Sequence, residues 1–281
     1  MSSASQPAKP VVNHYENFPV ASILCPPALR PAIAAIYWFA RTADDLADEG
    51  NASPQTRLAD LTAYRADLAA CAAGQTSSAR WAGVFKPLQP VIAQYRLPIN
   101  LLTDLLSAFE QDIVKTRYAS QAELLDYCRR SANPVGRLLL HLYSVNGAES
   151  LTQSDCICSA LQLINFWQDL SHDIPAGRIY LPADGFLQHG VTETQLLQLQ
   201  VNPETTALIA ANVVWAQALM LQGAPLVKKV PGRAGWELRL VVQGGLRIAE
   251  KIEQLGFNTL RARPKITPWD KLVMAWRTLW M

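Results

Sequence analysis

The sequence has little charge of either sign and almost no excess of one sign over the other. Only 17% of its 281 residues are charged, and 25 Lys and Arg residues against 23 Asp and Glu residues give a formal net charge of +2 at pH 7. Such a balance creates no strong positive field, so we expect no binding to nucleic acid. Half of the residues are hydrophobic, which excludes a disordered chain and predicts a sizeable buried core.

The cysteine patterns of disulfide-rich and zinc-binding proteins are also missing. The five cysteines are odd in number and include no Cys-x-x-Cys pair, which predicts reduced thiols in the cytoplasm. The first dozen residues lack the apolar core of a secretory signal, and we expect residues 1–13 to form a flexible polar tail. No Gly-x-Gly-x-x-Gly element occurs, so no dinucleotide site is predicted.

Period-2 alternation long enough for a sheet is absent, whereas apolar residues recur at helical spacing along most of the chain. We therefore predict one all-α domain of nine or ten helices over residues 14–281. The stretch between Glu204 and Lys228 carries no charge, but polar residues and Pro225 interrupt it, which favours a buried core helix over a membrane span. The expected helical ranges are 28–49, 54–74, 81–95, 100–115, 120–145 with a kink at Pro134, 154–172, 192–200, 203–227, 232–255 and 268–280.

Two acidic segments carry the strongest functional signal, and the first follows Arg41. Asp44 and Asp48 are four residues apart, which places them on one helix face about 6 Å apart along the axis. That face continues the apolar stripe of Ile33 and Tyr37, whereas ordinary surface charges lie opposite an apolar stripe.

The second segment repeats this pattern with Asn165, Asp169 and Asp173, which follow Leu161 at four-residue intervals. Buried amides and carboxylates are costly without partners, and like charges four residues apart repel. Mg²⁺ resolves both problems, because it takes oxygen ligands and is typically held by carboxylates together with substrate phosphates. The two segments together thus favour facing acidic helices that bind Mg²⁺ and a diphosphate over two unrelated solvated turns.

These motifs resemble a known family. Asp-Asp-x-x-Asp at 44–48 and Asn-x-x-x-Asp-x-x-x-Asp at 165–173, followed by Arg178-Ile-Tyr-Leu-Pro, are similar to the paired motifs of the squalene/phytoene synthases. The resemblance continues through His-Tyr-Glu-Asn-Phe at 14–18 and Ala-Ile-Tyr-Trp-Phe-Ala-Arg at 35–41 to the C-terminal helices. It implies an isoprenoid-synthase helical bundle with a central apolar pocket.

The resemblance also implies roles for individual residues. Two or three Mg²⁺ ions and the substrate diphosphate would bind to Asp44, Asp48, Asn165, Asp169 and Asp173. Arg41 and Arg178 would contact phosphate oxygens, which suits the planar guanidinium. His14 and Tyr37 match positions that line the family's site. Aromatic faces stabilise carbocations, and those nearest to the motifs are Phe18, Tyr37, Phe39 and Trp167.

One departure from the family pattern makes the predicted activity more specific. Ser131-Ala-Asn133-Pro-Val-Gly136 replaces the usual Val-Ala-Gly-x-Val-Gly, and together with the opening at 14–22 it is similar to the hydroxysqualene synthase branch of bacterial hopanoid biosynthesis. That branch ionises presqualene diphosphate and quenches the carbocation with water, without NADPH, beside a presqualene diphosphate synthase and a hydroxysqualene reductase. Asn133, in the kinked helix, is a candidate for the polarity near that water.

Three alternatives stay open at this point. Two farnesyl diphosphates could condense to presqualene diphosphate or dehydrosqualene, C20 substrates could give phytoene, or a non-catalytic helical binding protein could retain the fold. The C-terminal segment mixes Trp269, Trp276 and Trp280 with cations, so it either packs on the bundle or lies on a membrane surface. We accordingly expect a cytoplasmic protein, with peripheral membrane contact as an open alternative.

Overall fold

The computed structural model describes residues 25–281, and that part of the chain folds into helices with no β-strand. The all-α prediction is therefore confirmed. In chain order the helices are α1 (Arg30–Asp48), α2 (Pro54–Ala72), α3 (Ala82–Tyr95), α4 (Ile99–Asp112), α5 (Gln121–Ser131), α6 (Asn133–Leu142), α7 (Ala148–Gln168), α8 (Leu170–Asp173), α9 (Ala183–His189), α10 (Glu193–Leu197), α11 (Pro203–Gly223), a 3₁₀ helix (Ala224–Lys228), α12 (Gly232–Gln254) and α13 (Pro268–Thr278).

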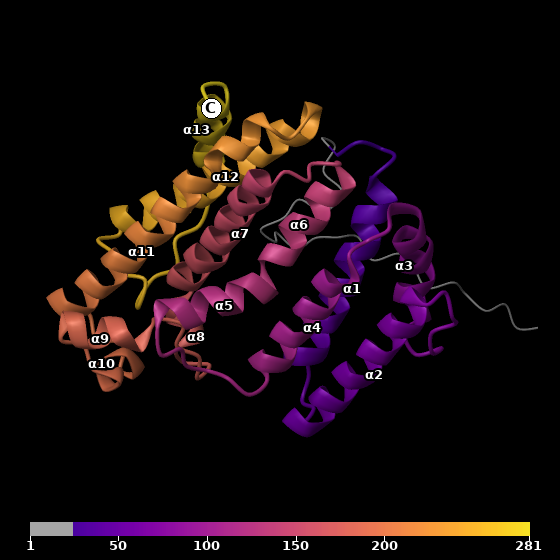
Figure 1. Ribbon diagram of the computed structural model, residues 1–281. Coiled ribbons are helices and arrows are strands. Elements are labelled where there is room, and N and C mark those ends of the chain that lie inside the picture. The colour runs from indigo at the N-terminus through magenta and orange to yellow at the C-terminus, as the bar shows by residue number, and fades with distance from the viewer. Residues whose placement is uncertain (1–24) are drawn as a thin grey trace, which may run out of the picture.

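Two groups of buried side chains hold these helices together. Helices α1 to α4 enclose one core, in which the rings of Phe39, Tyr64 and Phe85 lie in contact. Helices α5 to α12 enclose the other around the central helix α7 (Figure 1). Leu138 and Leu142 of α6 enter the first core, so α6 joins the two groups.

Local sequence signals explain several helix ends. Ser53 accepts a hydrogen bond from the Thr56 amide and Pro54 follows it, which is a favourable way to begin α2. Ser120 caps α5 in the same way. Pro134 interrupts the predicted helix over 120–145, which becomes α5 and α6 with Ala132 between them. The sequence analysis missed α9.

Helix α11 and the 3₁₀ helix after it form the one segment of the described chain, Pro203–Lys228, that is long and apolar enough to cross a membrane. Core helices of globular proteins meet the same criterion. Here Leu208, Val213 and Met220 are fully buried, and α11 packs along α7. This packing is that of the core helix predicted from the sequence.

Replacing Gly223 by Ala tests the close approach of α11 to α7. A Cβ atom at this position would lie 2.5 Å from the Gln153 carbonyl oxygen and 2.9 Å from the Ile157 amide nitrogen. We expect Gly223→Ala to lower the free energy of unfolding by roughly 1–3 kcal/mol, measured by urea denaturation, because backbone atoms must move apart. Gly83→Ala in α3 is the matched control, since nothing lies within 4 Å of its added Cβ. Equal stability of the two variants would contradict this packing.

Candidate active site

Helix α1 carries the first acidic motif on a face that the bundle leaves partly open. Its buried positions, such as Ile36 and Ala43, belong to the adjacent face. Tyr37 and Asp44 are half-buried, and Asp48 is exposed. Asp44 and Asp48 thus lie beside the buried face of α1 and not on it, and their carboxylates are partly exposed to solvent.

Arg41 belongs to this acidic turn. Its guanidinium forms ion pairs with Asp45 at 2.7 Å and with Glu49 at 2.7 Å, and it lies 3.5 Å from Asp44. These contacts balance part of the negative charge of the motif within α1 itself. The contact of Arg41 with substrate phosphate stays a prediction.

The second acidic motif lies at a break between two helices. The predicted single helix over 154–172 begins earlier, at Ala148, and α7 ends at Gln168, so Asp169 lies between α7 and α8. The Ser171 amide donates to the Thr259 carbonyl at 3.1 Å, which ties the break to the segment after α12. Helical hydrogen bonding still links Asp173 to Asp169 (2.9 Å) and Asp169 to Asn165 (3.0 Å), so the four-residue spacing is preserved.

Two different environments surround the carboxylates of this motif. Asp169 forms a two-point ion pair with Arg263, in which one N–O distance is 3.1 Å and the other contact is shorter. Burial raises the pKa of Asp173 to about 6, and the charge of Asp169 acts in the same direction while Arg178 and Arg263 oppose it. Arg263 was not among the predicted site residues.

Backbone pairing positions Arg178 between the two motifs. The Ile179 amide donates to the Thr116 carbonyl at 3.0 Å, and the Arg117 guanidinium donates to the Gly177 carbonyl at 2.6 Å. This short pairing holds the Arg-Ile-Tyr-Leu-Pro segment against the chain that follows α4.

Arg178 is half-buried, and negative charge converges on it. Burial alone would lower its pKa, yet the pKa is raised because the surrounding groups favour the charged form. Those groups are Tyr180, Asp112, Asp48 and Asp173. One guanidinium therefore interacts with both acidic motifs, although they are far apart in the sequence.

Asp112, at the end of α4, is a site residue that the sequence analysis missed. Burial raises its pKa to about 6, although a hydrogen bond from the Tyr127 hydroxyl (2.8 Å) and the charge of Arg178 oppose this shift. Its other carboxylate oxygen is buried and has no hydrogen-bond partner. Asp112 continues the buried stripe of Leu105 and Ala108, so the signal used for α1 was present here too.

A cavity of about 180 Å³ opens between these groups. Two arginines and two aspartates give it mixed charge. Arg57 also donates to three backbone carbonyls, one near the end of α1 and two in the loop between α1 and α2. The lining residues are Ala47, Asp48, Ala52, Pro54, Arg57, Asp112, Ile113 and Arg178.

The donor atoms suit Mg²⁺ in kind, because they are carboxylate and amide oxygens and include the unpartnered oxygen of Asp112. Within residues 25–281, however, no three His, Cys, Asp or Glu side chains stand close enough to hold one ion. The carboxylates instead surround arginines, and Arg263 engages both oxygens of Asp169. The ligand set Asp44, Asp48, Asn165, Asp169 and Asp173 stays a prediction.

The structure describes only two of the four remaining predicted site residues. His14 and Phe18 lie outside the described residues. Tyr37 makes an edge contact with the neighbouring Trp38 ring, at 5.2 Å between centroids. Asn133 is buried at the start of α6 and accepts a hydrogen bond from Ser159 of α7 at 2.9 Å.

Two aromatic residues near the motifs are packed inside the two cores. Phe39 and Trp167 are both fully buried, and Phe39 stacks on Tyr64 in the first core. Whether either ring contacts a carbocation stays a prediction.

A different aromatic cluster lies beside Asp112. Tyr180 stacks on Phe166 with ring centroids 3.7 Å apart, and Tyr118 and Tyr127 extend the group. The hydroxyl of Tyr127 reaches Asp112. The Arg-Ile-Tyr-Leu-Pro segment thus supplies one charged and one aromatic residue to the same region.

The model of the squalene/phytoene synthase family matches residues 11–270. The chain belongs to this family. Its members act on prenyl diphosphates and are generally Mg²⁺-dependent enzymes. As expected for a family member, the fold is that of the helical isoprenoid synthases.

Individual relatives agree with this assignment. The chain is 31% identical to the hydroxysqualene synthase of Sinorhizobium fredii, over 97% of this chain and 91% of that protein. It is 40% identical to the hydroxysqualene synthase of Zymomonas mobilis, over 69% and 65% of the two chains. The crystal structure of squalene synthase HpnC from Alicyclobacillus acidocaldarius superposes with a TM-score of 0.80 at 37% identity, covering 87% of this chain and 90% of that one.

The buried carboxyl of Asp112 predicts a pH effect on the metal-free enzyme. Its raised pKa means that the folded protein retains a proton that the unfolded chain has released, so the unfolding free energy falls as the pH rises from about 4 to about 6. Asp112→Asn removes this contribution, which amounts to up to about 3 kcal/mol. Urea denaturation of both proteins across this range measures it. An identical pH dependence of the two would contradict the burial of a titrating Asp112.

Proposed function

We propose that the protein is a hydroxysqualene synthase, which converts presqualene diphosphate and water into hydroxysqualene and diphosphate. The cavity that Asp48, Asp112 and Arg178 line together carries this proposal, because it combines acidic and cationic groups suited to a metal-bound diphosphate, and the charge of Asp173 also acts on Arg178. The hydroxysqualene synthases among its relatives support the choice of product.

The diphosphate end of the substrate would bind where the two acidic motifs meet. When bound, Mg²⁺ neutralises the diphosphate and helps it to leave. We assign two or three ions to the five predicted ligands, which lie on α1, on α7, on α8 and at the break between the last two helices. Arg178 and Arg41 would contact phosphate oxygens, and Arg57 adds a third guanidinium to the cavity wall.

The reaction itself breaks one C–O bond and forms another. The bond electrons leave with the diphosphate, the C30 carbocation rearranges, and a water oxygen adds to it while its proton passes to solvent or to diphosphate. Because the carbocation reacts with water and not with a hydride donor, the reaction needs no NADPH. The isoprenoid chains would lie in a central apolar pocket lined in part by His14, Phe18 and Tyr37, with Asn133 as the candidate for polarity near the water.

We further place the enzyme in the cytoplasm between two others. Its substrate would come from an enzyme that condenses farnesyl diphosphate to presqualene diphosphate. Its product, a C30 allylic or cyclopropyl-derived alcohol, would pass to a reductase that replaces the hydroxyl group with hydrogen.

Product analysis tests the proposed reaction directly. Purified protein is incubated with Mg²⁺ and presqualene diphosphate, without NADPH, and the extract is identified by mass spectrometry. We expect a C30 alcohol. If presqualene diphosphate persists while farnesyl diphosphate is consumed in a parallel tube, the enzyme condenses prenyl diphosphates instead. No turnover of either substrate would indicate a non-catalytic protein.

Single carboxylate replacements test the metal ligands. Asp44→Asn and Asp169→Asn should each lower kcat by at least about 100-fold, because each removes negative charge from the predicted Mg²⁺–diphosphate site. Both side chains lie at the edge of the core, so circular dichroism should be unchanged. Glu253→Gln, an exposed carboxylate of α12, is the control. Activity like that of the wild type in both variants would refute the ligand assignment.

A further inference from the structure

The C-terminal helix α13 turns its apolar side away from the protein. Trp269, Leu272 and Trp276 belong to α13, and Leu279 and Trp280 lie in the turn that follows it. Their spacings of three, four, three and one residues place them on one side of the helix and of this turn. Their exposed fractions lie between 56% and 77%. We call these five residues the tryptophan face. A surface helix of a globular protein normally shows the opposite orientation, with its apolar side on the core.

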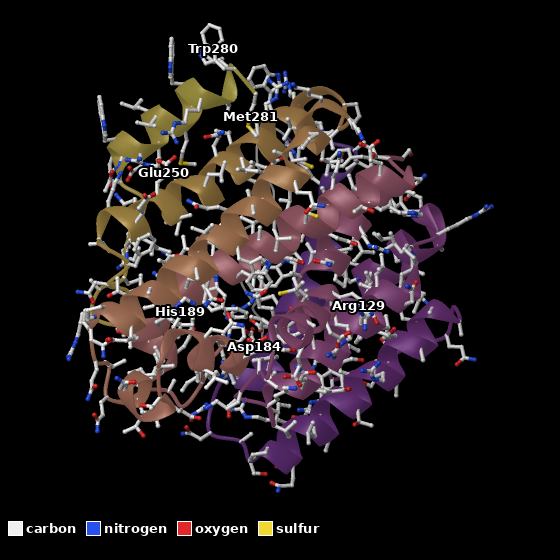
Figure 2. The ribbon with its side chains drawn as sticks, turned by 60° about the vertical axis from the view of Figure 1, so that its left-hand side comes forward. Arg129, Asp184, His189, Glu250, Trp280 and Met281 are labelled. Atoms are coloured by element: carbon white, nitrogen blue, oxygen red, sulfur yellow. The ribbon has the colours of Figure 1, made fainter. Side chains whose placement is uncertain are left out.

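Polar contacts on the inner side fix this orientation. Asp270 is buried and forms ion pairs with Arg247 (2.7 Å) and Lys251 (2.8 Å) of α12. Arg277 pairs with Glu250, also of α12. Figure 2 shows Glu250 beside α13 and Trp280 at the outer edge of the molecule. The tryptophan face is therefore held outward by specific contacts.

The segment that carries the tryptophan face has an excess of positive charge. Residues 261–281 contain five basic side chains and a single acidic one, Asp270, which is buried and paired with α12. Arg263 and Arg277 pair with Asp169 and Glu250, so the excess of positive charge comes from Arg261, Lys265 and Lys271. A further exposed tryptophan, Trp236 of α12, lies nearby under the guanidinium of Arg239, which also donates to the Thr278 carbonyl. An apolar face with tryptophans and a basic rim is complementary to the headgroup region of an anionic bilayer.

We propose that α13 docks the enzyme on the surface of an anionic phospholipid membrane through the tryptophan face. The helix has 11 residues and is about 16 Å long, which is too short to span a hydrocarbon core of about 30 Å, so it lies in the plane of the interface. A symmetric dimer through the same face would bring the basic residues of two copies together, and their repulsion disfavours a second copy of the chain as the partner.

The docking face is also connected to the acidic site along the chain. The segment between α12 and α13 contacts the second acidic motif three times: the Thr259 carbonyl accepts from Ser171, Arg263 pairs with Asp169, and the Pro264 carbonyl accepts from Gln168. A membrane-bound α13 would therefore keep the site near the bilayer. If the proposed function holds, this shortens the path of a C30 product into lipid.

Vesicle flotation of the full-length protein tests the docking. We expect it to float with vesicles of phosphatidylcholine and phosphatidylglycerol, less with phosphatidylcholine alone, and less at high salt. The triple variant Trp269→Ala/Trp276→Ala/Trp280→Ala should bind at least about tenfold more weakly. These side chains are exposed, so the thermal unfolding midpoint should stay close to that of the wild type.

Two controls make the test specific. Val214→Ser/Leu221→Ser changes exposed apolar residues of α11, and Leu187→Ala changes an exposed residue of α9; both should float like the wild type. The proposal is wrong if the wild type does not float, if the triple variant floats equally well, or if the α11 variant alone loses binding. A dimer in light scattering that the triple variant lacks would assign the face to a second copy. Turnover in detergent, measured in parallel, reports on the proposed function separately.

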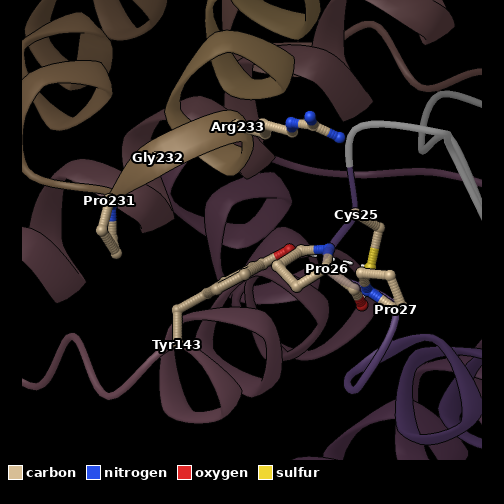
Figure 3. Close-up of a pocket in the computed structure, with 7 residues that line it drawn as sticks. All are labelled: Cys25, Pro26, Pro27, Tyr143, Pro231, Gly232 and Arg233. Atoms are coloured by element: carbon tan, nitrogen blue, oxygen red, sulfur yellow. Dashed lines mark hydrogen bonds between the residues drawn. The ribbon is translucent and has the colours of Figure 1, made fainter.

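A neighbouring hollow of about 410 Å³ contributes nothing further to the docking surface. It lies between the start of α1 and the start of α12 and is lined by Cys25, Pro26, Pro27, Tyr143, Pro231, Gly232 and Arg233 (Figure 3). The side chains around it are mostly proline rings and the Tyr143 ring, and the lining includes no member of the tryptophan face.

Discussion

The site depends on the balance between clustered carboxylates and the arginines placed among them. Asp48, Asp112 and Asp173 come from three different helices. Without Arg178, the burial of Asp112 and Asp173 and the repulsion between the carboxylates would oppose folding at this end of the bundle. Arg263 performs the same function for Asp169, and Arg41 for the acidic turn of α1. In this state arginines supply the positive charge that the metal ions would supply with substrate.

This arrangement links stability to function. Asp112 and Asp173, whose pKa values are raised to about 6, lower the stability of the fold when they are ionised. A bound cation would reduce this destabilisation. Large cores on either side offset this destabilisation, with Phe39, Phe85 and Leu102 buried in one and Trp167 and Leu208 in the other. The segment after α12 completes the arrangement, since it supplies Arg263 and also leads into the outward-facing tryptophans of α13.

Sequence patterns predicted every helix except α9, and both acidic motifs, because helical periodicity and four-residue spacing are local properties. They located the break at Pro134, whose missing amide acts wherever it occurs. The break at Asp169 could not be predicted, since it depends on a hydrogen bond from Ser171 to Thr259, far away in the chain. Arg57 and Arg263 were also missed, because their place at the site depends on contacts with residues elsewhere in the chain. Asp112, in contrast, continues the buried stripe of α4 and could have been predicted from it.

The central claim is that these groups form one metal–diphosphate site, and thermal unfolding of the full-length protein with inorganic diphosphate tests it most directly. Ligands that bind the folded state raise the unfolding midpoint. We predict a clear rise when Mg²⁺ and diphosphate are added together, little change with either alone, and loss of the rise in Asp169→Asn. No rise with both present, or the same rise with diphosphate in the absence of Mg²⁺, would contradict the account.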